Sequence, residues 1–137
     1  LVLDTNLLVA GLRSRTGASN AILIAAFRRR FQWCCSVPLY YEYQDVLNRA
    51  EFLVETGLTR KQIAGFLEDA ASVIIPVGVD FRWRPQLQDP DDEMVLETAI
   101  NARGAIVTHN RKDFGHVPAQ FGLDLLSPAD ALKRITT

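Results

Sequence analysis

The side chains best suited to catalysis in this sequence are acids that lie far apart along the chain. Asp4 follows an apolar run near the start, Glu42 and Asp92 lie further along, and Asn110 is followed three positions later by Asp113. Carboxylate and amide oxygens are the hard ligands that Mg²⁺ and Mn²⁺ prefer. If a fold brings these groups together, their like charges raise one another's pKa values, and a divalent cation relieves that repulsion.

Such a site favours hydrolysis of phosphodiester bonds. A divalent cation can lower the pKa of a water molecule, orient it towards the phosphorus and stabilise charge on the leaving oxygen. The two histidines, His109 and His116, follow no spacing that recruits zinc, and we expect neither to be a ligand or a base. The two cysteines are adjacent, at Cys34 and Cys35, which excludes a disulfide framework and a paired C-x-x-C zinc motif. A reducing, cytoplasmic setting is therefore expected.

The composition is that of one globular domain, residues 1–137. The apolar fraction is 48%, and no apolar run approaches the roughly 20 residues of a membrane span, so we expect no membrane association. The sequence opens at Leu1 rather than Met, and we expect the natural chain to begin earlier. The net charge of −1 does not by itself indicate a nucleic-acid binder.

Strands and helices are predicted to alternate along the chain. The expected strands are residues 1–3, 31–37, 73–75, 105–108 and 125–126. The expected helices are residues 18–31, 38–57 with a possible break, 59–70, 91–103 and a short one capped by Ser127. The triplet 4–6 suits a turn or a helix start, and residues 78–90 show no clear period, which indicates an irregular connection.

This alternation predicts an α/β fold with a largely parallel sheet covered by helices on both faces. Ligands of such folds bind beyond the carboxyl ends of the strands. Asp4 and Asn110 follow expected strands, and Glu42 and Asp92 lie near the starts of expected helices. We therefore expect these side chains to meet at one edge of the sheet.

Four segments together resemble PIN-domain proteins, in particular the toxin components of bacterial and archaeal toxin–antitoxin pairs. They are residues 2–6, 36–42, 89–92 and 107–114, and the resemblance spans nearly the whole chain. It implies a PIN-like three-layer α/β/α sandwich and a metal-dependent ribonuclease. It also implies Asp4, Glu42 and Asp92 as metal ligands for Mg²⁺ or Mn²⁺, with Thr5, Asn6 or Thr108 as polar neighbours.

The sequence departs from the family at the fourth acidic position. Where the family commonly has aspartate this chain has Asn110, whose amide oxygen can coordinate a metal but adds no charge. Either metal affinity is lower or Asp113 compensates. The expected catalytic set is Asp4, Glu42, Asp92, Asn110 and Asp113, and the expected metal ligands are the first four of these.

Each acid also has an ordinary structural interpretation. Asp4 could be a helix cap, and Glu42 a solvated helix residue that only the resemblance selects over Glu51 or Glu55. Asp91 and Asp92 both suit a helix N-terminus without a catalytic role, and the family spacing of sixteen residues before Thr108 selects Asp92. Asn110 and Asp113 could form a turn after a strand.

The resemblance further implies an RNA substrate, a cognate antitoxin that blocks the crevice, and a homodimer. Basic residues in segments that should flank the crevice are candidates for binding RNA phosphates, with solvated loops as the equal alternative. They are Arg13, Arg15, Arg111 and Lys112. The run 28–30 is interpreted mainly as a helix C-terminus.

Two other functions are compatible with the sequence. With Asn110 in place of an acid, the chain could be a catalytically weak PIN-like module that binds RNA or protein. A phosphatase with Asp4 as a covalent nucleophile is the other alternative, but it expects a second acid where Asn6 stands.

Overall fold

The computed structural model describes residues 1–80, 87 and 89–136. The strands are β1 (Val2–Leu3), β2 (Cys34–Cys35), β3 (Ile75–Pro76), β4 (Ile106–Val107) and β5 (Leu125–Leu126). The α-helices are α1 (Thr5–Arg13), α2 (Ala18–Phe27), α3 (Val37–Leu47), α4 (Ala50–Thr56), α5 (Arg60–Val73), α6 (Pro90–Ala102), α7 (Val117–Gln120) and α8 (Pro128–Thr136). A 3₁₀ turn covers Arg111–Asp113.

All strand pairs are parallel, as the sequence predicted. One sheet has the order β1-β4-β5, and β2 pairs with β3 in a second sheet. The two sheets meet where the Cys34 N–H donates to the Leu1 carbonyl, at 2.8 Å. The strands therefore run in the spatial order 3-2-1-4-5, and the expectation that residues 105–108 form a central strand is confirmed.

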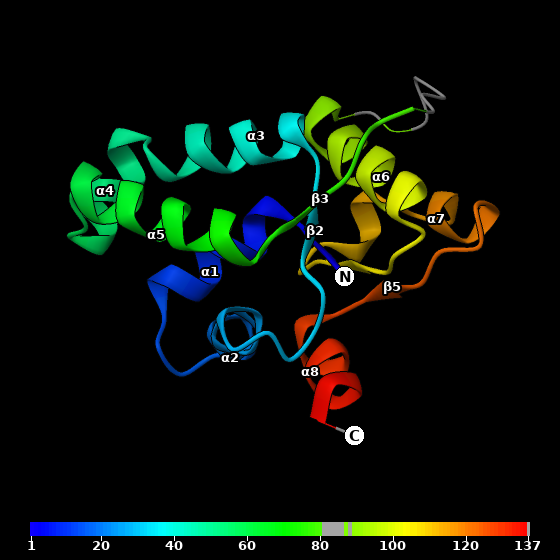
Figure 1. Cartoon of the computed structure of the whole chain (residues 1–137), viewed down its shortest axis with the longest axis horizontal. Coiled ribbons are helices and arrows are strands. Elements are labelled where there is room, and N and C mark those ends of the chain that lie inside the picture. Colours follow the sequence, from blue (N-terminus) through cyan, green and yellow to red (C-terminus); the bar gives the residue numbers. More distant parts are fainter. Residues whose placement is uncertain (81–86, 88, 137) are drawn as a thin grey trace.

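Helices pack around these strands in an α/β arrangement consistent with the expected three-layer fold. Helix α6 packs on β1, β2 and β4, and α8 packs on β5 and α2. Figure 1 shows α3, α4 and α5 extending together to one side of the strands. The core is centred on β1 and β4, whose four residues are fully buried. Among the residues described, no helix is long and apolar enough to cross a membrane.

Several helix boundaries agree with the local sequence signals. Thr59 and Gln62 form a reciprocal capping box at the start of α5. Gly57 ends α4 with φ of 73°, in the left-handed region that glycine adopts without strain. The Ser127 side chain accepts a hydrogen bond from the Asp130 N–H, which confirms the predicted cap of the last helix.

Other elements differ from the expectation. A full helix, α1, begins at Thr5 within the triplet 4–6, where the sequence indicated only a turn or a helix start. Helix α2 ends at Phe27 rather than Phe31, and Arg29 turns into the left-handed region with φ of 56°. The short α7 was not predicted.

The third strand lies later than expected and contains a proline. The expected strand at 73–75 was wrong at its start, because Val73 is the last residue of α5. The N–H groups of Ile75 and Val77 donate to the carbonyls of Trp33 and Cys35, and Pro76 falls between these donors. Its missing N–H therefore breaks no bond of the ladder. Most of the irregular connection predicted at 78–90 lies outside the described residues.

Candidate active site

A cavity of about 130 Å³ lies at the carboxyl ends of β1 and β4, and we call it the acidic cavity. Four acids predicted from the sequence line it: Asp4, Glu42, Asp92 and Asp113. The other lining residues are Thr5, Asn6, Val46, Arg49, Asp89 and Asp91. Carboxylates from the N-terminus of α1, from α3, from the start of α6 and from the segment after β4 thus meet in one place.

The Asp4 side chain lines this site and is bound by Thr108. Asp4 occupies the N-cap position of α1, yet its side chain makes no cap hydrogen bond. Instead, the buried Thr108 hydroxyl donates to Asp4 Oδ2 at 2.6 Å, and the Asn110 N–H donates to Thr108 Oγ1 at 3.0 Å. Burial raises the pKa of Asp4, an effect that the Thr108 hydrogen bond opposes and the charge of Asp113 increases.

Glu42 is brought to the cavity by α3. Ser36 and Pro38 begin this helix, with the Ser36 side chain accepting from the Leu39 N–H. The Tyr43 hydroxyl donates to the carbonyl of Leu3 at 2.5 Å in the buried core, which fixes α3 to the end of β1. Burial raises the pKa of Glu42 to about 6, and the negative charge of Asp91 contributes in the same direction.

Asp92 lies in the first turn of α6. Asp89 caps this helix by accepting from the Asp91 N–H at 2.9 Å, and Pro90 opens the first turn. Asp92 is 8% exposed, whereas Asp91 is exposed although it lines the same cavity. Burial raises the pKa of Asp92 to about 7, and the charge of Asp4 is the next largest cause.

The donor set suits a hydrated hard cation more than a closely ligated one. Within the described residues, no three His, Cys, Asp or Glu side chains stand in an arrangement that could hold a metal ion by themselves. The acids of the cavity nevertheless offer oxygen ligands. The pKa values of Asp4, Glu42 and Asp92 are raised, by burial first and by neighbouring carboxylates in addition, while the charge of Arg49 opposes the shift of Glu42. A divalent cation that keeps several waters, as Mg²⁺ does, fits these residues.

Asn110 does not line the acidic cavity. Its side chain is exposed and lines a wider hollow beside the acidic cavity, and it is not among the lining residues of the acidic cavity itself. Asp113 lines both. Asp113 is therefore better placed than Asn110 to act as the fourth acid of this cavity.

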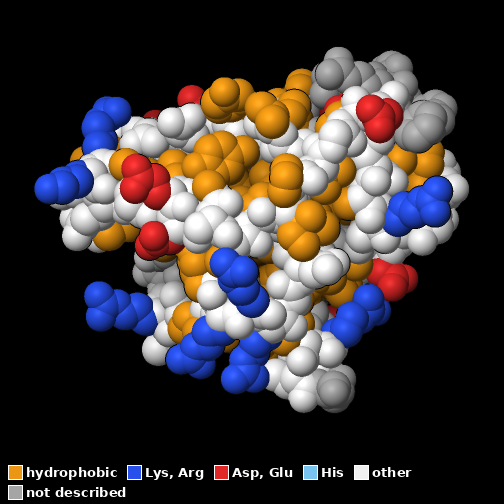
Figure 2. Space-filling model, viewed as in Figure 1, with side chains coloured by type: hydrophobic (Ala, Val, Ile, Leu, Met, Phe, Trp, Pro, Cys, Tyr) orange, Lys and Arg blue, Asp and Glu red, His pale blue; other side chains and the backbone are white. Residues whose placement is uncertain are grey.

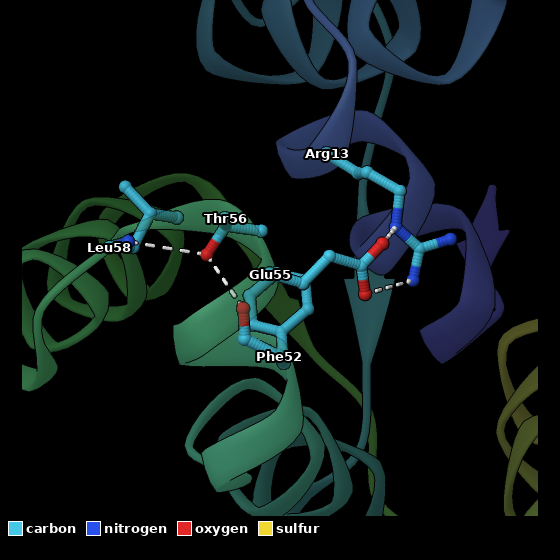
Figure 3. Close-up of polar contacts among 5 residues, drawn as sticks. All are labelled: Arg13, Phe52, Glu55, Thr56 and Leu58. Carbon is cyan, nitrogen blue, oxygen red and sulfur yellow. Dashed lines mark hydrogen bonds and ion pairs between the residues drawn. The ribbon is translucent and has the colours of Figure 1, made fainter.

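The basic residues predicted to bind RNA divide into two pairs. Arg111 and Lys112 line the hollow that adjoins the acidic cavity. Arg13 lies at the opposite end of α1 from Asp4, where it pairs with Glu55 of α4 through Nε–Oε1 and Nη2–Oε2 distances of 2.6 and 3.2 Å (Figure 3). The exposed Arg15 follows the end of α1 and is also absent from the lining of the acidic cavity.

Four residues near the site were not singled out as functional by the sequence. Arg49 lines the acidic cavity just past the end of α3, where the helical spacing from Glu42 no longer applies. Asp89 precedes a proline at a helix start, which is a signal for a cap. Ser19 Oγ and His109 Nε2 lie 2.5 Å apart, a contact between residues ninety positions apart that no local pattern predicts.

The fold and the convergent acids define an α/β domain with a nuclease-like architecture. A family model of the PIN domain matches residues 1–112, most of the chain, so the protein belongs to the PIN-domain family. PIN domains are generally nucleases that bind nucleic acid, and they typically use divalent metal ions. The match includes Asp4, Glu42, Asp92 and Asn110 and ends one residue before Asp113. No curated protein matches this chain.

Proposed function

We propose that the protein is a metal-dependent endoribonuclease, the toxin of a toxin–antitoxin pair. The observation that carries this proposal is the meeting of Asp4, Glu42, Asp92 and Asp113 in one small cavity, with three of their pKa values raised. Carboxylates kept this close destabilise a protein unless they serve a ligand, and a divalent cation is the ligand that compensates them.

Each residue has a distinct task in this proposal. Asp4, Glu42 and Asp92 would hold Mg²⁺ or Mn²⁺, directly or through water, and Asp113 would take the fourth acidic position that Asn110 cannot fill with charge. When bound, the cation supplies activation of a water molecule and charge stabilisation on the phosphate. Thr108 fixes the orientation of the Asp4 carboxylate through its 2.6 Å hydrogen bond. Arg111 and Lys112 would bind phosphates of the RNA as it enters from the adjoining hollow.

The partners implied by the resemblance belong to the same proposal. A cognate antitoxin would block the acidic cavity, and two copies of the chain would form a homodimer. The exposed apolar side chains of Val37, Tyr41 and Ile75 support the homodimer, because they lie unpartnered on the surface of α3 and β3. The free thiols of Cys34 and Cys35 suit a reducing compartment such as the cytoplasm.

A second candidate function keeps the fold without the catalysis. The described residues hold no three-residue group ready to bind a metal, which favours a catalytically weak PIN-like module that binds RNA or protein. The two candidates differ in one respect that can be measured, which is metal-dependent cleavage.

The deciding experiment is cleavage of a circular single-stranded RNA and of a mixed pool of structured and single-stranded RNAs, with Mg²⁺, with Mn²⁺ and with EDTA. A circle has no ends, so only an endonuclease can open it. We expect cleavage with either metal, none with EDTA, and a loss of about 100-fold in Asp4→Asn, which removes the first ligand.

Asp69→Asn is the matched control, because Asp69 is an exposed acid on α5 and is not among the residues that line the acidic cavity. This variant should cut as the wild type does. If the wild type and Asp4→Asn behave alike across a range of metal concentrations, the nuclease proposal fails and the binding module becomes the better interpretation.

A further inference from the structure

One wall of the acidic cavity carries an arginine, Arg49, to which the proposed function assigns no role. Glu42, Val46 and Arg49 all line the cavity, and Glu42 and Val46 lie four residues apart on one face of α3. Arg49 lies just past the end of α3, at the N-cap position of α4. It is the one Lys or Arg that lines this cavity among the residues described.

The Arg49 guanidinium uses only part of its N–H donors in contacts with the described residues. Its Nη2 lies 3.2 Å from Asp45 Oδ2, and Asp45 is not among the lining residues of the cavity. Within the described part of the chain this is its one ion pair, so the other N–H donors make no bond to the carboxylates around them. The side chain is 52% exposed. A guanidinium with donors to spare can bind two oxygens of a phosphate at once.

Arg49 cannot be one of the metal ligands, because a guanidinium has no acceptor atom. Its charge lowers the pKa of Glu42, but its ion pair is with Asp45, which is 67% exposed and does not line the cavity. We therefore take a phosphate bound by Arg49 to be a neighbour of the phosphate being cleaved rather than the same group. Its contact strengthens the binding of the substrate without touching the reacting atoms.

We propose that Arg49 binds a flanking phosphate of the RNA strand at the α3 side of the acidic cavity, with Asp45 holding its side chain in place. This inference rests on the proposed function and adds a substrate-binding residue to it. Arg49 contributes to substrate binding, and the catalytic role stays with the four acids.

The first test measures binding without cleavage. Fluorescein-labelled oligouridine is titrated with the Asp4→Asn protein in Mg²⁺, with and without Arg49→Ala, and the anisotropy is followed over a range of salt concentrations. We expect Arg49→Ala to weaken binding about tenfold and to lower the slope of log K against log salt by about 0.7, the effect of one lost phosphate contact on a single strand. Arg49→Lys, which keeps the charge but loses the bidentate fork, should retain part of the affinity.

Arg134→Ala is the matched control. Arg134 is 53% exposed and pairs with Asp124 at 3.2 Å, almost as Arg49 pairs with Asp45, but it lines a hollow that includes Leu1 and Gly104, which precede β1 and β4. It therefore lies at the opposite edge of the strands from the acids. This variant should bind oligouridine as the parent does, and thermal unfolding should show similar small effects of both substitutions.

The second test separates binding from chemistry in the protein that retains Asp4. Arg49→Ala should raise KM about tenfold and leave kcat within about twofold. A fall in kcat at unchanged KM would overturn the proposal, as would an RNA affinity equal to that of Arg134→Ala. A lower Mg²⁺ requirement with unchanged RNA affinity would also overturn it, because Arg49 would then act on the carboxylates.

These outcomes are distinct from failure of the nuclease proposal. If the wild type cuts RNA and Arg49→Ala does so with the same KM, only the role of Arg49 fails. If no RNA is cut but Arg49→Ala still weakens oligouridine binding, the phosphate contact stands and the nuclease does not.

Discussion

Asp92 is the residue at which the cost of gathering acids is clearest. Its side chain is nearly buried, and four other carboxylates act on it. Burial raises its pKa to about 7, and that of Glu42 rises to about 6 for the same first reason. At neutral pH the folded protein therefore resists ionisation of groups that the unfolded chain ionises freely.

Stability without metal should consequently fall as the pH rises. An acid whose pKa is raised by folding contributes stability below its unfolded pKa, near 4, and loses it as the pH passes the folded value, about 7 for Asp92. In EDTA we expect the melting temperature to fall between pH 5 and pH 8. We expect Mg²⁺ to raise it, and to raise it more at pH 8 than at pH 5, because only ionised carboxylates bind the cation. Differential scanning fluorimetry measures both effects.

Asp92→Asn should remove much of this dependence. The amide cannot ionise, so at pH 8 in EDTA the variant should melt higher than the wild type by roughly 3–5 °C, the shift that about 1 kcal/mol produces in a domain of this size. The stabilisation by Mg²⁺ should be correspondingly smaller. A variant that melts lower than the wild type at pH 8 would show that the Asp92 carboxylate stabilises the fold, contrary to the direction of its pKa shift.

The sequence predicted which acids would meet, but not the whole lining of their cavity. All four acids were named in advance, because strand ends and helix starts of a parallel fold converge at one edge and because the family resemblance selected Glu42 and Asp92 among the acids nearby. The exposure of Asn110 was not foreseen, since a residue type does not reveal which way a turn directs it. The roles of these residues in metal binding and catalysis remain predictions.

At the scale of elements, the position of Asp4 depends on how closely α1 packs against α2. A Cβ atom added to Gly11 would lie 2.5 Å from Leu23 Cδ1 and 3.1 Å from the Ser19 carbonyl. The Asn20 side chain also donates to the Gly11 carbonyl at 2.8 Å. The glycine weakens α1 as an isolated helix, which is one reason that the sequence did not predict this helix, but it allows the two helices to approach.

Gly11→Ala should therefore destabilise the protein. The gain in helix propensity, about 1 kcal/mol, is offset by a clash with a buried leucine and a backbone carbonyl, for which overpacking costs about 1–3 kcal/mol. We expect a net loss of roughly 1 kcal/mol in the free energy of unfolding, measured by urea denaturation. The control is Gly65→Ala in α5, where an added Cβ meets nothing within 4 Å, and this variant should be more stable than the wild type. Equal gains in both variants would contradict the tight packing of α1.

The remaining elements show where local signals suffice. The starts of α5 and α8 were predicted because Thr59 and Ser127 carry their capping signals within four residues. The third strand was placed too early because Val73 favours strands by its branching, yet here it completes the last turn of α5. The boundary between α5 and β3 depends on how β3 pairs with β2, and a local sequence pattern does not indicate that pairing.

At the scale of the whole molecule, one face is unusually apolar. Figure 2 shows hydrophobic side chains gathered over α3, α5 and β3. Val37 and Tyr41 are 63% and 62% exposed, and Ile75 on the strand β3 is 40% exposed. Tyr40, Ala71 and Pro76 help to line a mainly apolar hollow of about 320 Å³ on the same face. A surface of this kind is typical of a contact between protein chains.

If this face joins the two copies of the proposed homodimer, Tyr41→Asp should yield a monomer, because a buried unpaired charge opposes association. Light scattering coupled to size-exclusion chromatography gives the mass directly. Val54→Asp is the control, since Val54 is an exposed valine on α4, 84% accessible and outside the lining of the hollow. A monomeric wild type, or a dimer that survives Tyr41→Asp, would remove this face from the homodimer proposal.

The hydrogen bond from Thr108 to Asp4 joins residues 104 positions apart, and β1 lies between β2 and β4 at the middle of the strands. Strand β1 therefore waits for one of its two neighbours, β4, while the roughly one hundred residues between them are synthesised. At roughly 5–20 residues per second, this interval lasts about 5–20 s. The acids cannot assemble before β4 has left the ribosome. The order of translation therefore delays the proposed ribonuclease activity while the nascent chain is still close to its own messenger RNA.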